Sequence, residues 1–271
     1  MFQTVHLLKH CQIEDTMKKL YTWLCANKLT LNVTKTNYCI FRGKQTLRKD
    51  DINEINFGHN SIKRVEHVRY LGMYIDEKLS WKYHVYNILK QLSKTSSSFK
   101  FIRNHVPHQC KKQLYYSFVH SKIIYGIEVY GNTNKSLLTK LQVIQNKILK
   151  ILYKKDWYLS TNTLHKEINI LKVNDLYNMS VLKFVHKCKI NDSPNIFNEY
   201  YTERHTIHNY NTRYAKTIDL PKFNKITYGK KSIRYIGAQF YNNITTKIKN
   251  VPDMNVKEFS NFLKDWYIDQ Y

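Results

Sequence analysis

Apolar residues near the N-terminus recur at helical spacing. Ile13, Met17, Leu20 and Leu24 follow one another at intervals of four, three and four, with polar residues between them. Because this spacing brings apolar side chains onto one face of a helix, it predicts an amphipathic helix that ends near residues 27–28.

The pattern then changes to the period of a strand. Leu29, Leu31 and Val33 alternate with polar residues, and residues 37–42 are also predicted to form a strand. A polar loop covers residues 45–54 and is followed by further short β-type runs, at residues 55–57, 62–65 and 68–75. Residues 58–60 are a turn signal. A small antiparallel sheet is the simplest arrangement of these runs.

Beyond Ser80, a suitable N-cap, the pattern becomes helical. The first apolar stripe consists of Trp81, Val85, Ile88, Leu92, Phe99 and Ile102. A second helix is expected from near Pro107 through Leu114, Phe118 and Ile123. The near-heptad stripe of a third helix consists of Leu137, Leu141, Ile144, Ile148 and Ile151. Later helices are expected at residues 173–189, 232–249 and 256–267.

The expected class is therefore α+β, with a small antiparallel sheet at the N-terminus followed by a mostly helical region. Three parts are predicted: residues 1–78, 79–190 and 191–271. The third part begins with a polar, weakly periodic segment at residues 191–230, which is either a long ordered loop or a linker.

The charge of the chain favours a polyanionic partner. Lys and Arg number 44 against 20 Asp and Glu, which gives a net charge of +24. Such an excess is typical of nucleic-acid-binding proteins, although a biased Lys- and Asn-rich genome is an alternative source of it. The basic residues on the first two long helices fall largely between the apolar positions: Lys82, Lys90, Lys94, Lys100, Arg103, Lys111 and Lys112. The third helix has Lys140, Lys147, Lys150, Lys154 and Lys155 beside its apolar stripe. Three successive helices with this bias favour one shared basic surface over three unrelated solvated faces.

Composition excludes several other classes. A content of 42% hydrophobic residues indicates a folded chain, and we expect a soluble, intracellular protein because the sequence has neither a membrane-length apolar run nor a signal peptide. The sequence leaves open whether the compartment is the nucleus or the cytoplasm. The five cysteines are scattered without C-x-x-C spacing, so neither a disulfide framework nor a metal site is expected.

Three blocks of sequence resemble non-LTR (LINE-type) retrotransposon reverse transcriptases. Residues 20–36, LYTWLCANKLTLNVTKT, are similar to the W-(F/L)-x-x-N-K-L-x-L-N-x-x-K-T segment that follows the catalytic hairpin of that family. Residues 69–76, RYLGMYID, and 79–84, LSWKYH, resemble its YLG primer-grip block and the start of its thumb. The third block, at residues 210–213, 229–232 and 241–244, follows in the order seen downstream of the thumb.

The resemblance implies roles for particular residues. Tyr70, Leu71 and Gly72 would form the primer-grip turn, where glycine allows a backbone conformation and a close approach that other residues resist. Lys35 matches a palm lysine proposed to protonate the leaving pyrophosphate, and the alternative is a surface lysine in a turn. The basic residues of the first thumb helix, with Lys111 and Lys112, would follow the phosphate backbone of an RNA and DNA primer-template without sequence specificity.

The resemblance does not imply catalysis by this chain. In the family, an aromatic-Ala-Asp-Asp hairpin precedes the segment that matches residues 1–2, and a third carboxylate lies further upstream. These carboxylates hold the two Mg²⁺ ions of the parent enzyme, so no cofactor is expected in this fragment. Asp50 and Asp51 lie in a charged loop and Glu14 and Asp15 open a helix, so neither pair is expected to replace them.

Three hypotheses follow. The first is a truncated reverse transcriptase that binds RNA or DNA without catalysis. The second is one piece of an intact reverse transcriptase whose upstream palm, with any endonuclease, is missing from the gene model. The third is the product of a decayed element, without function, whose helix from Ile13 has lost the palm sheet on which it should pack.

Overall fold

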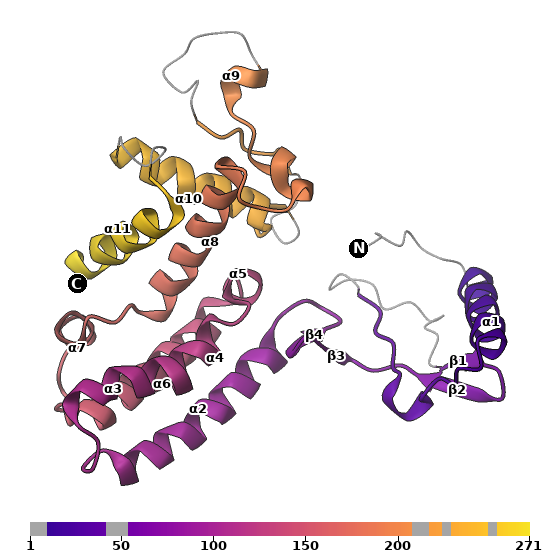
Figure 1. Cartoon of the computed structure of the whole chain (residues 1–271), viewed down its shortest axis with the longest axis horizontal. Helices are drawn as coiled ribbons and strands as arrows, with labels where there is room; N and C mark the ends of the chain where they lie inside the picture. The colour runs from indigo at the N-terminus through magenta and orange to yellow at the C-terminus, as the bar shows by residue number, and fades with distance from the viewer. Residues whose placement is uncertain (1–9, 42–53, 208–216, 224–228, 249–253) are drawn as a thin grey trace. The chain divides into compact units, whose positions relative to one another are not determined.

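A computed structural model describes residues 10–41, 54–207, 217–223, 229–248 and 254–271 of the chain (Figure 1). The chain forms two compact units, Met1–Tyr86 and Asn87–Tyr271. The predicted α+β class is confirmed, because two small antiparallel sheets precede a long series of helices. The division into three parts at residues 78 and 190 stays a prediction.

The first unit begins with the predicted amphipathic helix, α1 (His10–Ala26). Its side chains are half-buried at Ile13, Met17 and Leu24. The ring of Tyr21 meets the ring of Phe57 edge-on, with 5.4 Å between the ring centroids. The confirmed helix therefore packs through its apolar face on the strand that contains Phe57.

Two separate hairpins take the place of the single sheet expected from the sequence. Strand β1 (Glu54–Phe57) pairs antiparallel with β2 (Asn60–Lys63), and β3 (His67–Tyr70) pairs with β4 (Met73–Asp76). Ile55 and Ile62 are opposite each other in the first hairpin, and both are buried. This buried apolar pair stabilises the first hairpin, which is only four residues long on each side.

Two strand predictions are wrong. Residues 29–33 form no strand, and a short 3-10 helix, η1 (Val33–Lys35), begins where the alternation ends. The side chain of Asn32 accepts hydrogen bonds from the amide of Lys35 and the hydroxyl of Thr34, at 3.2 and 2.7 Å. This local bonding competes with strand pairing. Residues 37–41 contribute only an isolated bridge between Tyr38 and Arg64, and residue 42 lies outside the described residues.

The second unit is helical, and α2 (Lys82–Ile102) leads into it. The remaining helices are α3 (His108–Tyr115), α4 (Ser121–Ile124), α5 (Ile127–Tyr130), α6 (Lys135–Tyr153), α7 (Thr161–Ile168), α8 (Val173–Lys189), α9 (Arg204–Ile207), α10 (Ile233–Lys247) and α11 (Val256–Asp269). A π-helical stretch, η2 (Tyr116–His120), joins α3 to α4. All six helices predicted beyond residue 80 are confirmed, the second of them interrupted by η2, and α5, α7 and α9 are additions to them.

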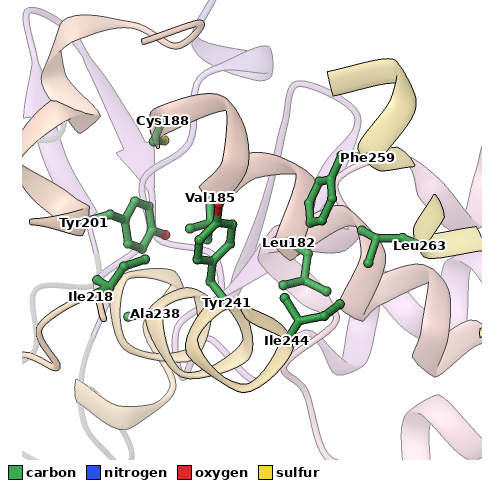
Figure 2. Packing of buried hydrophobic residues seen from close by; sticks show 10 residues of the cluster. All are labelled: Leu182, Val185, Cys188, Tyr201, Ile218, Ala238, Tyr241, Ile244, Phe259 and Leu263. Carbon is green, nitrogen blue, oxygen red and sulfur yellow. The ribbon is translucent and has the colours of Figure 1, made fainter. Parts of the chain in front are cut away.

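Helix α8 is central to the core of this unit and contacts α5, α6, α10 and α11. Figure 2 shows side chains of α8, α10 and α11 meeting in one apolar cluster. Its buried members are Leu182, Val185, Cys188, Tyr201, Ile218, Ala238, Tyr241, Ile244, Phe259 and Leu263. The close approach of α10 depends on Gly237, where an added Cβ would lie 2.7 Å from both Val185 Cγ2 and Tyr201 Oη.

The polar segment after α8 is ordered where the structure describes it. A 3-10 helix, η3 (Asn195–Tyr201), ends in the buried ring of Tyr201, and Ile218 is also buried in the same core. Asn242 of α10 holds Ile218 from both sides, because its side chain accepts from the amide of Ile218 and donates to its carbonyl, each at 2.8 Å. The described part of residues 191–230 therefore contains η3 and α9 and contributes Tyr201 and Ile218 to the core of this unit. Within the described ranges, none of the helices is long and apolar enough to cross a membrane.

Candidate nucleic-acid interface

The tip of the second hairpin is a two-residue turn with an unusual backbone. Tyr70 and Met73 close the turn, and its central residues Leu71 and Gly72 have φ values of 46° and 82°. Two positive φ values are typical of a type I′ turn, which matches the twist of the strands. Glycine adopts this conformation freely, whereas a leucine pays roughly 1–2 kcal/mol for it.

The strained residue is also a solvent-facing one. The side chain of Leu71 is 71% exposed, and Tyr70 beside it is exposed as well. Burial of apolar surface within this unit therefore does little to offset the backbone strain at Leu71. A positive φ at an exposed residue other than glycine makes the tip a candidate contact for a ligand.

A buried carboxylate connects this hairpin to α2. Asp76 is the last residue of β4, and its Oδ2 accepts a hydrogen bond from the amide of Trp81 at 2.8 Å. Its Oδ1 accepts from the amides of Lys78 and Ser80 at 3.2 and 3.0 Å. Leu79 and Trp81 both have positive φ values in this turn. Asp76 thus organises the entry to α2, and the hydroxyl oxygen of Ser80 accepts a hydrogen bond from the amide of Lys82 at 3.4 Å.

Helix α2 places its predicted lysines opposite its buried face. Ile88, Leu92 and Phe99 are buried, as the apolar stripe requires. Lys90, Lys94 and Lys100 are exposed, and so is Lys82 in the first turn. A row of ammonium groups on the outer side of a long helix is an arrangement that can follow successive phosphates.

Phe101 adds an aromatic ring to the solvent-exposed side of α2, next to Lys100 along the chain. Arg103 follows the helix and is half-buried, with its Nε buried and without a hydrogen-bond partner in the described part of the chain. Exposed aromatic rings beside cations are suited to the faces of unpaired bases.

Helix α3 divides its two predicted lysines between interior and surface. Lys111 is only 8% exposed, and its ammonium group lies 5.9 Å from the centroid of the Tyr153 ring. Lys112 is half-buried. Burial lowers the pKa of Lys264, and repulsion by the charge of Lys112 lowers it further. Because Lys111 is buried beside the ring of Tyr153, its ammonium group does not belong to the exposed basic surface.

Lysines of other elements are partly engaged in the fold. Lys35 is an exposed residue of η1, as expected for a surface lysine in a turn. On α6, Lys150 donates to two backbone carbonyls, and Lys155 just beyond the helix pairs with Glu167. Lys147 and Lys154 are exposed.

The described residues do not fit a two-metal polymerase site. No group of three His, Cys, Asp or Glu side chains in the described part of the chain could hold an ion. Asp76 already uses both carboxylate oxygens on backbone amides. His186 is a core residue, whose Nε2 lies 2.8 Å from the carbonyl oxygen of Met254. Asp50 and Asp51 lie outside the described residues.

Sequence reasoning missed two features of this surface. The role of Asp76 depends on three amides that a strained turn brings together, and no sequence pattern predicts such a turn. The exposure of Phe101 was predictable, since it falls seven residues after Lys94 and so on the same helical face. Asp76 fixes the turn before α2, and Phe101 adds an exposed ring to the basic side of that helix.

A basic, largely helical chain with an outward row of lysines has the features of a nucleic-acid-binding protein. Comparison with known proteins narrows this class. The chain is similar to the RNA-directed DNA polymerase from mobile element jockey of Drosophila melanogaster, with 27% identity over 132 residues, which are 48% of this chain and 14% of the relative. It is also similar to the probable RNA-directed DNA polymerase from transposon X-element of the same species, with 22% identity over 61% of this chain and 18% of the relative.

The probable RNA-directed DNA polymerase from transposon BS is a further relative, 24% identical over 40% of this chain and 12% of its own length. No family model matches the chain, and no solved structure does. The matched region spans less than a fifth of each of these relatives. The resemblance predicted from the motifs is confirmed: the chain is similar to a segment of non-LTR retrotransposon RNA-directed DNA polymerases.

Proposed function

We propose that this chain serves as a nucleic-acid-holding part of a retrotransposon RNA-directed DNA polymerase. Its ligand would be an RNA and DNA primer-template, held through phosphates and without sequence specificity. The observation that carries the proposal is the outer row of α2, where Lys90, Lys94 and Lys100 are exposed opposite a buried apolar face. The named activity of the jockey and X-element relatives supports the choice of ligand.

The hairpin tip has a second role in this proposal. Leu71 and Gly72 present backbone and an exposed apolar side chain at a strained turn, which suits close packing against a sugar or base at a primer end. Asp76 would fix the turn between that hairpin and α2. The chain's own residues thus bind and orient, and the proposal assigns them no bond-making step.

An alternative is that the chain is one piece of an active polymerase. The relatives are far longer than the matched region, and this favours a larger protein with further parts. The carboxylates that hold Mg²⁺ would then belong to an upstream palm, together with any endonuclease. The test is the genomic sequence 5′ of the start codon: an in-frame aromatic-Ala-Asp-Asp hairpin supports this alternative, and its absence leaves a binding protein.

The proposed binding is tested by removing charges from α2. A variant with Lys90→Gln, Lys94→Gln and Lys100→Gln should bind an RNA–DNA duplex more weakly than the unaltered chain. The slope of log affinity against log salt should fall in magnitude by about 2–3, because each phosphate contact contributes roughly 0.9.

A matched control removes the same charge elsewhere in the second unit. Lys222, Lys230 and Lys257 are exposed residues outside α2, and their replacement by glutamine also lowers the net charge by three. The control variant should retain most of the salt slope. If both variants lose affinity equally, total charge rather than the α2 row governs binding, and the proposal fails.

A further inference from the structure

The loop between α6 and α7 is held in place by polar contacts to its backbone. The ammonium group of Lys150 donates to the carbonyl oxygens of Trp157 and Leu159, at 2.6 and 2.8 Å. Asp156 Oδ1 accepts from the amide of Tyr158 at 2.8 Å, and the amide of Leu159 donates to the carbonyl of Asp156 at 3.3 Å. The loop is thus held both by Lys150 of α6 and by Asp156 of the loop itself, and we call it the pinned loop.

This pinned loop displays two neighbouring aromatic side chains. Trp157 is 58% exposed and Tyr158 is 97% exposed. The contacts that fix the loop use backbone atoms of both residues, so they leave the rings available. Tyrosine and tryptophan have few rotatable bonds, and an ordered backbone beneath them further reduces the entropy lost when they bind a planar ligand.

The surroundings of the two rings are cationic. Residues 147–167 contain five lysines, namely Lys147, Lys150, Lys154, Lys155 and Lys166. The two carboxylates of this segment are engaged, Asp156 with the amide of Tyr158 and Glu167 with Lys155. Lys147 is exposed on α6, and Lys154, the residue that caps the end of this helix and leads into the loop, is exposed as well.

We propose that Trp157 and Tyr158 form a stacking site for unpaired bases of a single-stranded RNA or DNA, with Lys147 and Lys154 contacting its phosphates. Adjacent exposed rings beside cations match the faces and the charges of a single strand, and stacking of this kind tolerates any base. A duplex hides its base faces, so it gains little here. The site therefore goes beyond the α2 row, which contacts phosphates alone, and gives the chain a second, strand-selective contact.

The test compares the double variant Trp157→Ala, Tyr158→Ala with the unaltered full chain. The probes are a single-stranded RNA of about 12 nucleotides and an RNA–DNA duplex of the same length. Affinity for the single strand should fall at least about fivefold, while affinity for the duplex stays within about twofold. Both side chains are exposed and the pinning atoms belong to the backbone, so the fold should persist, which an unchanged circular dichroism spectrum checks.

Trp23 supplies a matched control, because it is 56% exposed on α1. Trp23→Ala should leave affinity for the single strand unchanged. Tryptophan fluorescence gives a second readout: single-stranded RNA should quench emission in the unaltered chain and in Trp23→Ala, and quench it far less in Trp157→Ala.

Three outcomes overturn the inference. The first is an unchanged affinity of the double variant for the single strand, and the second is an equal loss of affinity for the single strand and the duplex. The third is a loss of self-association in the double variant, which would mean that a second copy of the chain occupies the site. Duplex binding that still depends on Lys90, Lys94 and Lys100 would leave the proposed function intact in each case. A chain that binds neither probe would contradict both proposals.

Discussion

Asp76 determines the local structure before α2, and the residues around it in the sequence do not predict this role. It is a buried carboxylate that holds three amides of the strained turn before α2. Hydrogen bonds from amides to a charged acceptor are worth roughly 1.5–3 kcal/mol each, and they offset the cost of the positive φ values at Leu79 and Trp81.

Asp76→Ala should therefore loosen the entry to α2. The amides of Lys78, Ser80 and Trp81 should exchange with solvent at least about tenfold faster, the equivalent of about 1.4 kcal/mol or more of lost local stability. Hydrogen exchange resolved by residue measures this. Glu77→Gln removes a carboxylate one position away and should leave the amide of Trp81 protected; equal acceleration in both variants would contradict the role of Asp76.

At the residue level, the sequence predicted which lysines are exposed but not which lysine is buried. The lysines of α2 fall opposite an apolar stripe, and the structure places them there. Lys111 also stands among polar neighbours in sequence, yet it is buried beside Tyr153 of α6. The contact joins residues 42 positions apart, and helical periodicity carries no information about the partner that covers a helix.

At the element level, the helices were predictable and the strands less so. The bounds predicted for α8 agree with the structure, and Ser232 caps α10 by accepting from the amide of Tyr235. Long periodic segments determine their own helices, whereas a strand depends on a partner elsewhere. Residues 29–33 alternate like a strand, but they form none, and the side chain of Asn32 caps a 3-10 helix that begins at Val33. Helix α7 was missed because it is only eight residues long.

The π-helical stretch η2 ends in a histidine whose protonation should weaken the fold. The ring of His120 contacts the ring of Tyr116, with 4.8 Å between their centroids. Burial, together with the smaller effect of the nearby charge of Lys183, lowers the pKa of His120 to about 4. Since this pKa is depressed relative to an unfolded value of about 6.5, the unfolded chain binds the proton more tightly between these pH values.

The free energy of unfolding should therefore fall as the pH is lowered from about 6.5 to 4, with a contribution from His120 of as much as 2–3 kcal/mol. His120→Gln should flatten this dependence relative to the unaltered chain. Urea denaturation at several pH values between 7 and 4.5 measures the effect. Parallel pH profiles for the two chains would rule out a role for His120.

At the level of the whole molecule, the two units differ in how they bury their apolar residues. The second unit has a continuous core of α8, α10 and α11 (Figure 2). In the first unit, the apolar face of α1 is at most half-buried at its described positions, and Leu20 and Trp23 are exposed. The sequence alone predicted the order of these parts but not the core of the second unit, which joins residues more than 70 positions apart.

Hydrogen exchange across the whole chain should reflect this difference. Amides of α1 and of the two hairpins should exchange faster than those of α6, α8 and α10, because local stability follows buried apolar contact. Equal protection in both units would contradict this expectation and would also weaken the hypothesis of a decayed product.

The central claim is that the chain holds nucleic acid through its basic surface. The most direct measurement is the affinity of the full chain for an RNA–DNA primer-template duplex across a series of salt concentrations. Binding at roughly micromolar concentration that weakens steeply and linearly on a log–log plot is expected, because bound lysines release counterions from the phosphates. Affinity that does not change between low and high salt would contradict the account.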